Sequence, residues 1–402
     1  MDVQKIRQDF PILTKQTLTY LDTAASSLTP NVVINKMNEY YYEYPVNVHR
    51  GVYQLSYKAT EHYTKARENI ARFINGSFEE TVFTRGASSA LNLVASSYGM
   101  NNLTKGDEII VSELEHHSHV LPWQMVAKKT GATLKYIPLN AEGRITVDNF
   151  KKTLTDHTKV VALTYISNVM GYETPLKEII QLAHAKGAVV SVDAAQAVPH
   201  KKVDVKALDC DFLAFSGHKM CGPTGIGVLY GKKALLEKME PIEFGGDMND
   251  YVDLFDAEFK DAPYKFETGT PPIAEAIGLS EAVDYLEAIG YDEILTHETM
   301  LKEMALSELS KIKGITIYNK TTETAIINFN IDGVHPHDAV SFFDQDHIAL
   351  RAGHHCAQLV IKWLNVAATL RASFYIYNTV EDVMRFIDSV KRARTFFSEV
   401  GF

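Results

Sequence analysis

The middle of the chain alternates short apolar runs with longer amphipathic stretches. The apolar runs at residues 107–113, 159–167 and 188–195 are rich in Val, Ile and Leu, as expected of strands buried on both faces, and residues 210–219 form a further apolar run. Between them lie stretches with apolar residues at helical spacing, and glycine ends several of these stretches. Strands that alternate with helices predict a mostly parallel sheet that helices cover on both sides.

The pattern changes after about residue 270. Two long helical stretches come first, followed by shorter strands within residues 324–331, 348–353 and 370–378 and by a last helix. This order is typical of an α+β unit. We therefore predict a large domain over residues 20–265 and a small domain over residues 266–402, with residues 1–19 packing on the small domain. The loop "DAPYKFETGTPP" marks the boundary.

Charge and cysteine content exclude several classes of partner. The net charge of -10 argues against nucleic acid or an anionic membrane as the main partner. The three cysteines, Cys210, Cys221 and Cys356, do not form the pattern of a disulfide framework and suit a reducing cytoplasm. We also expect no membrane span, because no apolar run has the necessary length.

Reactive side chains follow several predicted strands. Asp193 ends one strand, Asn168 ends another, and Lys219 ends a third. Ligands of α/β proteins bind beyond the carboxyl ends of parallel strands. A lysine that forms a Schiff base and a carboxylate that keeps a pyridine nitrogen protonated are the minimum set for pyridoxal phosphate (PLP). "TRGASSALNLVA" adds hydroxyls and a helix N-terminus for the phosphate. Spacing alone leaves open that these are ordinary loop residues.

Longer segments resemble a known family. "SVDAAQAVPHKKVDVKALDCDFLAFSGHKMCGPTGIGVLYG" resembles the core of the class V PLP enzymes, which have the aspartate-aminotransferase fold (PLP fold type I). "RAGHHCAQ" followed by "RASFYIYNT" is similar to the group II, or SufS-type, cysteine desulfurases. The resemblance runs from "DFPIL" to the last helix. It implies an α/β fold with a large domain containing a mostly parallel sheet and a smaller α+β C-terminal domain, PLP as cofactor, and conversion of L-cysteine to L-alanine.

The resemblance also assigns roles at the cofactor. Lys219 becomes the Schiff-base lysine and the proton shuttle at the substrate Cα. Asp193 pairs with the pyridine nitrogen, and Gln196 bonds the phenolic oxygen. His116 stacks on the ring and is placed for proton transfer. The resemblance implies that five residues bind the phosphate: Ala87 (through its backbone), Ser88, Ser216, His218 and, across a dimer interface, Thr270. It thus implies a homodimer with shared active sites.

Substrate recognition follows from the same resemblance. Arg371 grips the substrate carboxylate, a task suited to a guanidinium fork, and Asn168 assists. Arg351 lies close to Cys356 in sequence and is expected to help hold the substrate. His49 and Arg50 match a family segment near the site.

Two departures from the family pattern stand out. Ala87 and Ala352 occupy positions where relatives often have threonine. The hydroxyl lost at Ala87 is expected to weaken PLP binding at most, because backbone N–H groups remain. Nothing in the sequence explains Ala352.

Three interpretations of Cys356 compete: a structural thiol, a zinc ligand with His335 and His337 as further ligands, and a nucleophile. A nucleophile fits the PLP set, and the adjacent histidines and Arg351 are expected to favour the reactive thiolate. Cys356 would then take the substrate sulfur as a persulfide. No resident metal is predicted. Cys210 and Cys221 are expected to be inert core or turn residues.

The family's short cysteine loop implies an acceptor protein of the SufE or SufU type that comes to the site. His337, in "HPHD", is a candidate ligand to the zinc of a SufU-like partner, although an ordinary loop histidine remains the alternative. Iron–sulfur cluster assembly is the implied destination of the sulfur. Alternative functions are selenocysteine lyase, another class V PLP enzyme, or a non-catalytic metal or sulfur carrier.

Overall fold

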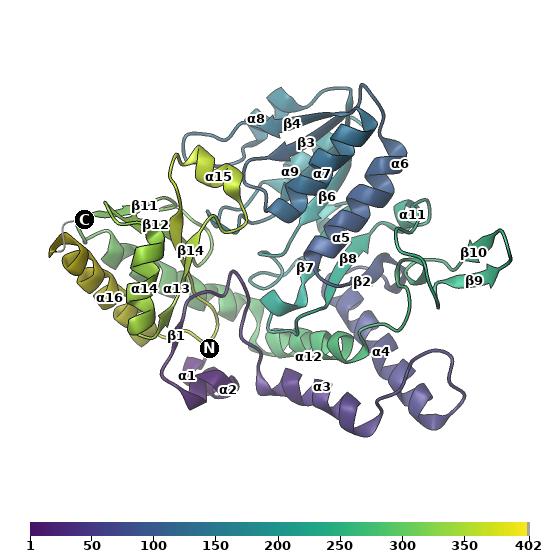
Figure 1. Cartoon of the computed structure of the whole chain (residues 1–402), viewed down its shortest axis with the longest axis horizontal. Helices are drawn as coiled ribbons and strands as arrows, with labels where there is room; N and C mark the ends of the chain where they lie inside the picture. Colours follow the sequence, from purple (N-terminus) through teal and green to yellow (C-terminus); the bar gives the residue numbers. More distant parts are fainter. Residues whose placement is uncertain (400–402) are drawn as a thin grey trace.

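A seven-stranded sheet lies at the centre of the protein (Figure 1). The structure is a computed structural model, and it describes residues 1–399. Strands β4, β3, β5, β6 and β7 are parallel, whereas β8 runs antiparallel between β7 and β2. The mostly parallel sheet is confirmed. Its strands are β2 (Thr81–Thr84), β3 (Glu108–Ser112), β4 (Thr133–Ile137), β5 (Thr158–Thr164), β6 (Val189–Asp193), β7 (Phe212–Ser216) and β8 (Gly227–Gly231).

Both faces of this sheet are buried, as the apolar strands predict. On β5, Val161 and Leu163 belong to one hydrophobic cluster, while Val160 and Ala162 belong to a second cluster on the opposite face. Helices supply the covering side chains. The helices between these strands are α5 (Ala87–Leu93), which continues through a π-helical stretch (Val94–Gly99) into α6 (Met100–Asn102), α7 (His117–Thr130), α8 (Val147–Thr153), α9 (Leu176–His184), α10 (Val205–Leu208) and α11 (Lys233–Leu236).

A smaller antiparallel sheet in the order β11-β12-β15-β14 forms the second unit. Its core runs from Leu301 to Phe397 and also takes in Leu21. The strands are β11 (Ile315–Ile317), β12 (Ile326–Ile331), β14 (Arg351–Gly353) and β15 (Thr369–Ser373). The helices in this part of the chain are α13 (Tyr291–Leu309), α14 (Pro336–Gln345), α15 (Gln358–Trp363) and α16 (Val380–Glu399).

Three helices pack together beside the large sheet: α3 (Asn31–Glu43), α4 (Gln54–Phe73) and α12 (Ile273–Ile289). Side chains of α12, including Ile277, belong to the core of the large sheet. The domain division at residue 266 stays a prediction. It falls just before α12, which packs with the large unit.

The N-terminal segment lies against the small unit (Figure 1). It contains α1 (Val3–Gln8), α2 (Pro11–Lys15) and β1 (Thr19–Tyr20), and β1 pairs in parallel with β13 (Ile348–Ala349). Arg7 forms a 2.9 Å ion pair with Asp382 on α16. The assignment of residues 1–19 to the small domain stays a prediction.

One element was not expected from the sequence. A hairpin of β9 (Asn249–Val252) and β10 (Ala257–Phe259) projects away from the body (Figure 1). Leu254 and Phe255 at its tip are 87% and 98% exposed. The remaining short elements are 3-10 turns at Phe78–Glu80, Gly217–Lys219 and Tyr264–Phe266. Among residues 1–399, no helix is both long enough and apolar enough to cross a membrane.

Candidate active site

A cavity of about 480 Å³ lies at the carboxyl ends of β5, β6 and β7, and residues of the small sheet line it as well. It brings together most of the residues that the sequence singled out, although they come from distant parts of the chain. The predicted residues in its lining are Ala87, Ser88, His116, Asn168, Asp193, Gln196, Ser216, His218, Lys219, Arg351, Cys356 and Arg371.

Lys219 and Asp193 form the reactive pair of this cavity. Lys219 ends the 3-10 turn after β7, and Asp193 ends β6. Burial lowers the pKa of Lys219 from its ordinary value, although the Asp193 carboxylate acts in the opposite direction. No hydrogen bond holds the Lys219 amine within residues 1–399. A buried lysine with a lowered pKa has more of its amine unprotonated, which makes it a better nucleophile and base.

His116 caps the N-terminus of α7. Its Nδ1 accepts a 3.1 Å hydrogen bond from the backbone N–H of Ser118. Burial, followed by the positive charge of Lys219, lowers the pKa of His116 to about 4. The ring is therefore neutral at physiological pH. Because Nδ1 is an acceptor, the proton lies on Nε2.

The predicted phosphate loop brings two segments into close contact. A Cβ atom at Gly227 would lie 2.4 Å from Cα of Gly86, so only glycine fits there. Gly86 itself has a φ of +152° and precedes α5. The backbone N–H of Ala87 donates to Ser216 Oγ at 2.8 Å. These groups leave the first turn of the helix facing the cavity.

Ser118 is a cavity residue that the sequence did not identify. Its Oγ lies 2.6 Å from Ser88 Oγ. The loop thus retains two neighbouring hydroxyls despite Ala87. The only sequence signal was a serine just after the two histidines of "EHHSH".

Arg371 and Asn168 have unused hydrogen-bonding capacity at the cavity. Arg371 is buried on β15, and its Nη1 donates to the backbone oxygen of Asn168 at 2.9 Å. Arg371 Nε and Asn168 Oδ1 are buried without a partner among the described residues. Buried polar atoms without a partner are rare in proteins. A donor and an acceptor are thus available for the carboxylate and amine of an amino acid.

Asp22 was also missed by the sequence. It forms a bidentate pair with Arg351 and contacts Arg371 Nη2 at 3.2 Å. Asp22 ends the short run "LTYLD", but nothing local to it indicates two arginine partners more than 300 residues away.

Cys356 sits in an exposed loop that several elements hold in place. His355 and Cys356 both have a φ of +53°. The Cys356 carbonyl accepts from the N–H of His117 at 2.8 Å, and the His355 carbonyl accepts from Asn168 Nδ2 at 2.7 Å. Within residues 1–399, no three His, Cys, Asp or Glu side chains are placed to hold a metal ion.

The charge around Cys356 differs from the expectation. The His355 ring bonds Thr369, and burial together with Arg371 lowers the pKa of His355 to about 2, so the ring is uncharged. The Arg351 guanidinium is paired with Asp22. His355 therefore adds no positive charge beside Cys356, and Asp22 balances the charge of Arg351; the role of these neighbours at the thiol stays a prediction.

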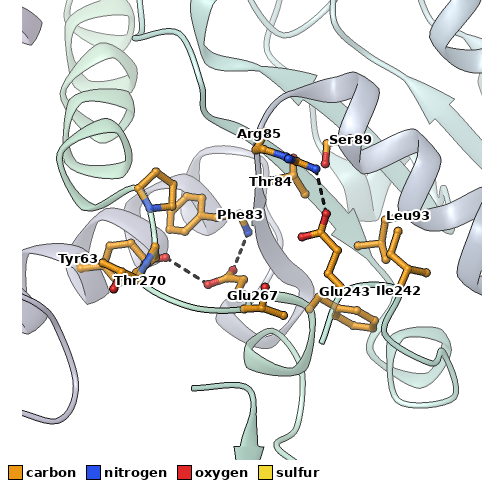
Figure 2. A pocket seen from close by; sticks show the side chains of 14 residues that line it. Tyr63, Phe83, Thr84, Arg85, Ser89, Leu93, Ile242, Glu243, Glu267 and Thr270 are labelled. Carbon is orange, nitrogen blue, oxygen red and sulfur yellow. Dashed lines mark hydrogen bonds and ion pairs between the residues drawn. The ribbon is translucent and has the colours of Figure 1, made fainter. Parts of the chain in front are cut away.

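Thr270, His49 and Arg50 do not reach the cavity of their own chain. Figure 2 shows Thr270 beside Tyr63 and Glu267 in a separate pocket of about 230 Å³. His49 lines a third pocket, and Arg50 pairs with Asp247.

The other two cysteines are buried and unpaired, as expected. Burial raises the pKa of Cys221 to about 12, and burial also raises that of Cys210. Neither thiol lines the cavity.

The cavity residues fit PLP. A buried carboxylate, Asp193, and a buried amine, Lys219, face one cavity together with serine hydroxyls at a helix start. This donor set matches the pyridine nitrogen, the aldehyde and the phosphate of the cofactor. Gln196 Nε2 donates one N–H to the Ala24 carbonyl at 2.6 Å, so its second N–H is left to donate to the ring oxygen.

Comparison with known proteins agrees with this geometry. The aminotransferase class-V family matches residues 19–386. Probable cysteine desulfurases from Halalkalibacterium halodurans and Staphylococcus aureus are 53% and 52% identical, over 100% and 99% of this chain and 100% and 98% of theirs. The structure of the cysteine desulfurase CsdA from Escherichia coli has a TM-score of 0.93 at 40% identity, covering 98% of this chain and 99% of that one. The apo cysteine desulfurase from Thermococcus onnurineus gives 0.94 at 39%, covering 98% of both. The chain belongs to the aminotransferase class-V family.

Proposed function

We propose that this chain acts as a PLP-dependent cysteine desulfurase and that Cys356 receives the sulfur. It converts L-cysteine to L-alanine and keeps the sulfur as a persulfide. The observation that carries this function is the presence of Lys219, Arg371 and Cys356 in the lining of one cavity. When bound, PLP supplies an electron sink for the bond to the substrate Cα.

Four side chains are proposed to bind the substrate carboxylate, move the Cα proton and hold the cofactor ring. Arg371 holds the substrate carboxylate through its unpartnered Nε. Lys219, whose lowered pKa favours the unprotonated amine, takes the Cα proton and returns it before L-alanine leaves. Asp193 would hold a proton on the ring nitrogen of bound PLP, and neutral His116, at the same cavity, would have its Nε2–H available as a donor.

Cys356 performs the transfer of sulfur. Its Sγ forms a bond to the substrate sulfur while the substrate C–S bond breaks. The electron pair of that bond stays with the substrate carbon, which takes up a proton and becomes the methyl group of L-alanine. Cys356 is left carrying the extra sulfur, and a thiol acceptor can remove it later.

The substitution Cys356→Ala tests this function. It is expected to lower alanine formation from L-cysteine by about 100-fold or more while the PLP absorbance stays. Selenocysteine, whose C–Se bond breaks more easily, should remain a substrate. Cys210→Ala serves as the control and should keep the parent rate. Release of sulfide from L-cysteine by Cys356→Ala at the parent rate would refute the proposal, and mass spectrometry should find the added sulfur on Cys356 alone.

The active form is proposed to be a homodimer with shared sites. Thr270 and His49 line pockets separate from their own cavity, and Arg50 is held beside one of them through Asp247. A second copy could therefore receive these side chains. Co-expressed Lys219→Ala and Thr270→Ala chains test this idea, because a mixed dimer has one intact site. PLP affinity at that site should match the parent protein, whereas the Thr270→Ala homodimer should bind PLP more weakly at both sites; parent affinity in the Thr270→Ala homodimer, or a mixed dimer without a site of parent affinity, would contradict sharing.

The sulfur acceptor is proposed to be a SufE-like or SufU-like protein, and iron–sulfur cluster assembly the destination of the sulfur. His335 and His337 are exposed at the start of α14, and their rings stack at 5.4 Å. An exposed imidazole is free to ligate the zinc of a SufU-like partner. His337→Ala should slow persulfide transfer to such a partner, whereas His347→Ala, another exposed histidine of the same unit, should not. Equal transfer by both variants would exclude this role.

We place the enzyme in the cytoplasm. Its three cysteines are all free, which suits a reducing compartment. Cell fractionation with an antibody against the chain tests the assignment, and recovery from the membrane or secreted fraction would overturn it.

A further inference from the structure

Two arginines face each other across adjacent strands at the cavity. Arg351 on β14 is the direct register partner of Arg371 on β15. Directly opposed residues of an antiparallel pair project from the same face, and like charges at such positions repel each other. Both side chains line the cavity. The pair therefore requires a counter-charge.

Asp22 supplies that counter-charge. Its two oxygens lie 3.1 Å from Arg351 Nε, Oδ2 lies 2.9 Å from Arg351 Nη2, and Oδ1 lies 3.2 Å from Arg371 Nη2. One carboxylate thus contacts both arginines, and Asp22 fixes the positions of both guanidiniums at once.

The backbone around Asp22 is anchored to the same sheet. Asp22 forms a bridge with Ser373, which lies two residues beyond Arg371. The N–H of Ser373 donates to the Leu21 carbonyl at 2.8 Å, and the N–H of Ala24 donates to Ser373 Oγ at 2.9 Å. The carboxylate is thus held at a fixed distance from the β15 strand.

Arg371 keeps an unpartnered donor for a ligand. Its Nη1 donates to the Asn168 carbonyl and its Nη2 to Asp22, so both ends of the fork are held in place. Its Nε is buried without a partner among residues 1–399. Because a guanidinium is planar and rigid, fixing both Nη atoms fixes the direction of Nε as well.

We propose that Asp22 is a positioning residue for substrate recognition: it holds Arg371 so that Nε is presented to the substrate carboxylate, and it occupies Arg351 so that the two arginines do not compete for that carboxylate. The inference rests on the proposed function, because the amino-acid substrate brings the carboxylate. Arg371 touches the substrate, whereas Asp22 acts through it.

A pair of ligands separates this role from general damage to the fold. L-Alanine and ethylamine both carry an amine that reacts at PLP, but only L-alanine has a carboxylate. In the PLP-loaded enzyme, Asp22→Asn should raise the Kd for L-alanine about 10-fold, as measured by the change in the PLP absorption spectrum. The Kd for ethylamine should stay within about twofold. Glu287→Gln, which removes a carboxylate paired with Arg72 at the surface, is the matched control and should change neither value.

A second pair of variants keeps the proposal testable if Asp22→Asn does not fold. If Asp22→Asn alone does not fold, the double variant D22N/R351Q removes the repulsion along with the counter-charge. It should bind L-alanine about 10-fold more weakly than R351Q alone, with equal affinity for ethylamine. An unchanged Kd for L-alanine, or an equal rise for both ligands, would overturn the proposal. Neither measurement involves sulfur, so a failure of the desulfurase function would show separately as absent alanine formation from L-cysteine.

Discussion

The cavity has two walls that are built in different ways. The large-sheet wall, formed by Lys219, Asp193 and His116, comes from strand ends and a helix start, and burial lowers the pKa of Lys219 and His116. The small-sheet wall, formed by Arg371 and Cys356 together with Arg351, depends on a carboxylate held between two arginines and on a loop with positive φ angles.

The difference separates two kinds of chemistry. In the large-sheet wall, burial lowers the pKa of Lys219 and His116 and so favours the uncharged forms that can accept a proton. Holding a carboxylate and taking up sulfur need a fixed charge and an accessible thiol. The small-sheet wall provides both through ion pairs and hydrogen bonds. Changes in the first wall should therefore affect the cofactor, and changes in the second wall should affect the substrate and the sulfur.

The largest effect is expected in the large-sheet wall. Lys219→Ala should remove the absorption band that PLP forms with a lysine and lower alanine formation by about 1000-fold or more, because no other lysine among the described residues lines the cavity. Absorption spectra and a product assay measure both losses. Lys206→Ala, at an exposed lysine, should change neither. If the band persisted in Lys219→Ala, the assignment of the large-sheet wall would be wrong.

A smaller effect is expected where the two walls meet. Asn168 donates to the His355 carbonyl and accepts, through its own carbonyl, from Arg371. The substitution Asn168→Ala keeps the second contact and removes the first together with the unpartnered Oδ1, which loosens the loop that carries Cys356 and takes away an acceptor for the substrate. We expect kcat/KM for L-cysteine to fall about 10-fold. Asn102→Ala, at a surface helix end, is the control, and equal kcat/KM values in the two variants would show that the walls are independent.

The stability of the protein is expected to depend on pH through His355, beside Cys356 in the small-sheet wall. The pKa of His355 falls from 6.5 to about 2 in the folded protein. Below pH 6.5 the unfolded chain therefore binds a proton that folded His355 does not, and stability decreases as the pH falls. Between pH 7 and pH 5 this group should cost about 2 kcal/mol of unfolding free energy.

Denaturant titrations at both pH values measure this loss. His355→Asn, which tolerates the positive φ, should reduce the pH dependence by that amount. His347→Asn, at an exposed residue with a φ of +58°, should keep it in full. If His355→Asn retained the whole dependence, another group would be responsible, with His116 in the other wall as the first candidate.

The smallest effect is expected away from both walls. Cys210 is fully buried in the core of the large sheet. Cys210→Ala should lower the unfolding free energy by about 1 kcal/mol through lost packing, with alanine formation unchanged. A loss of activity beyond the loss of folded protein would mean that this thiol reaches the chemistry.

The sequence predicted the large-sheet wall better than the small-sheet wall for a physical reason. Asp193, Asn168 and Lys219 follow strands whose carboxyl ends must meet at one sheet edge, so a local pattern locates them. Asp22 lies 349 residues from Arg371, and no local pattern records that contact. The direction of β8 was not predicted, because strand periodicity does not specify the direction of pairing. The β9–β10 hairpin was not predicted either.

The charge around Cys356 is a second feature that depends on contacts between distant parts of the chain. Adjacent residues in "RAGHHC" suggested a positive environment, but the structure pairs Arg351 with Asp22 and leaves His355 neutral. Proximity in sequence does not reveal which charges are already balanced. Thr270 illustrates a related gap, since the fold of one chain does not bring it to its own cavity.

The exposure of Cys356 also makes it vulnerable to oxygen. Cys210 and Cys221 are shielded by burial, whereas Cys356 is the exposed thiol. Peroxide that enters the cavity can drive an accessible cysteine through sulfenic and sulfinic acid to the irreversible sulfonic acid. The exposure that the proposed sulfur transfer requires also admits oxidants. Preparations kept in air should therefore lose activity while their fold and bound cofactor remain intact.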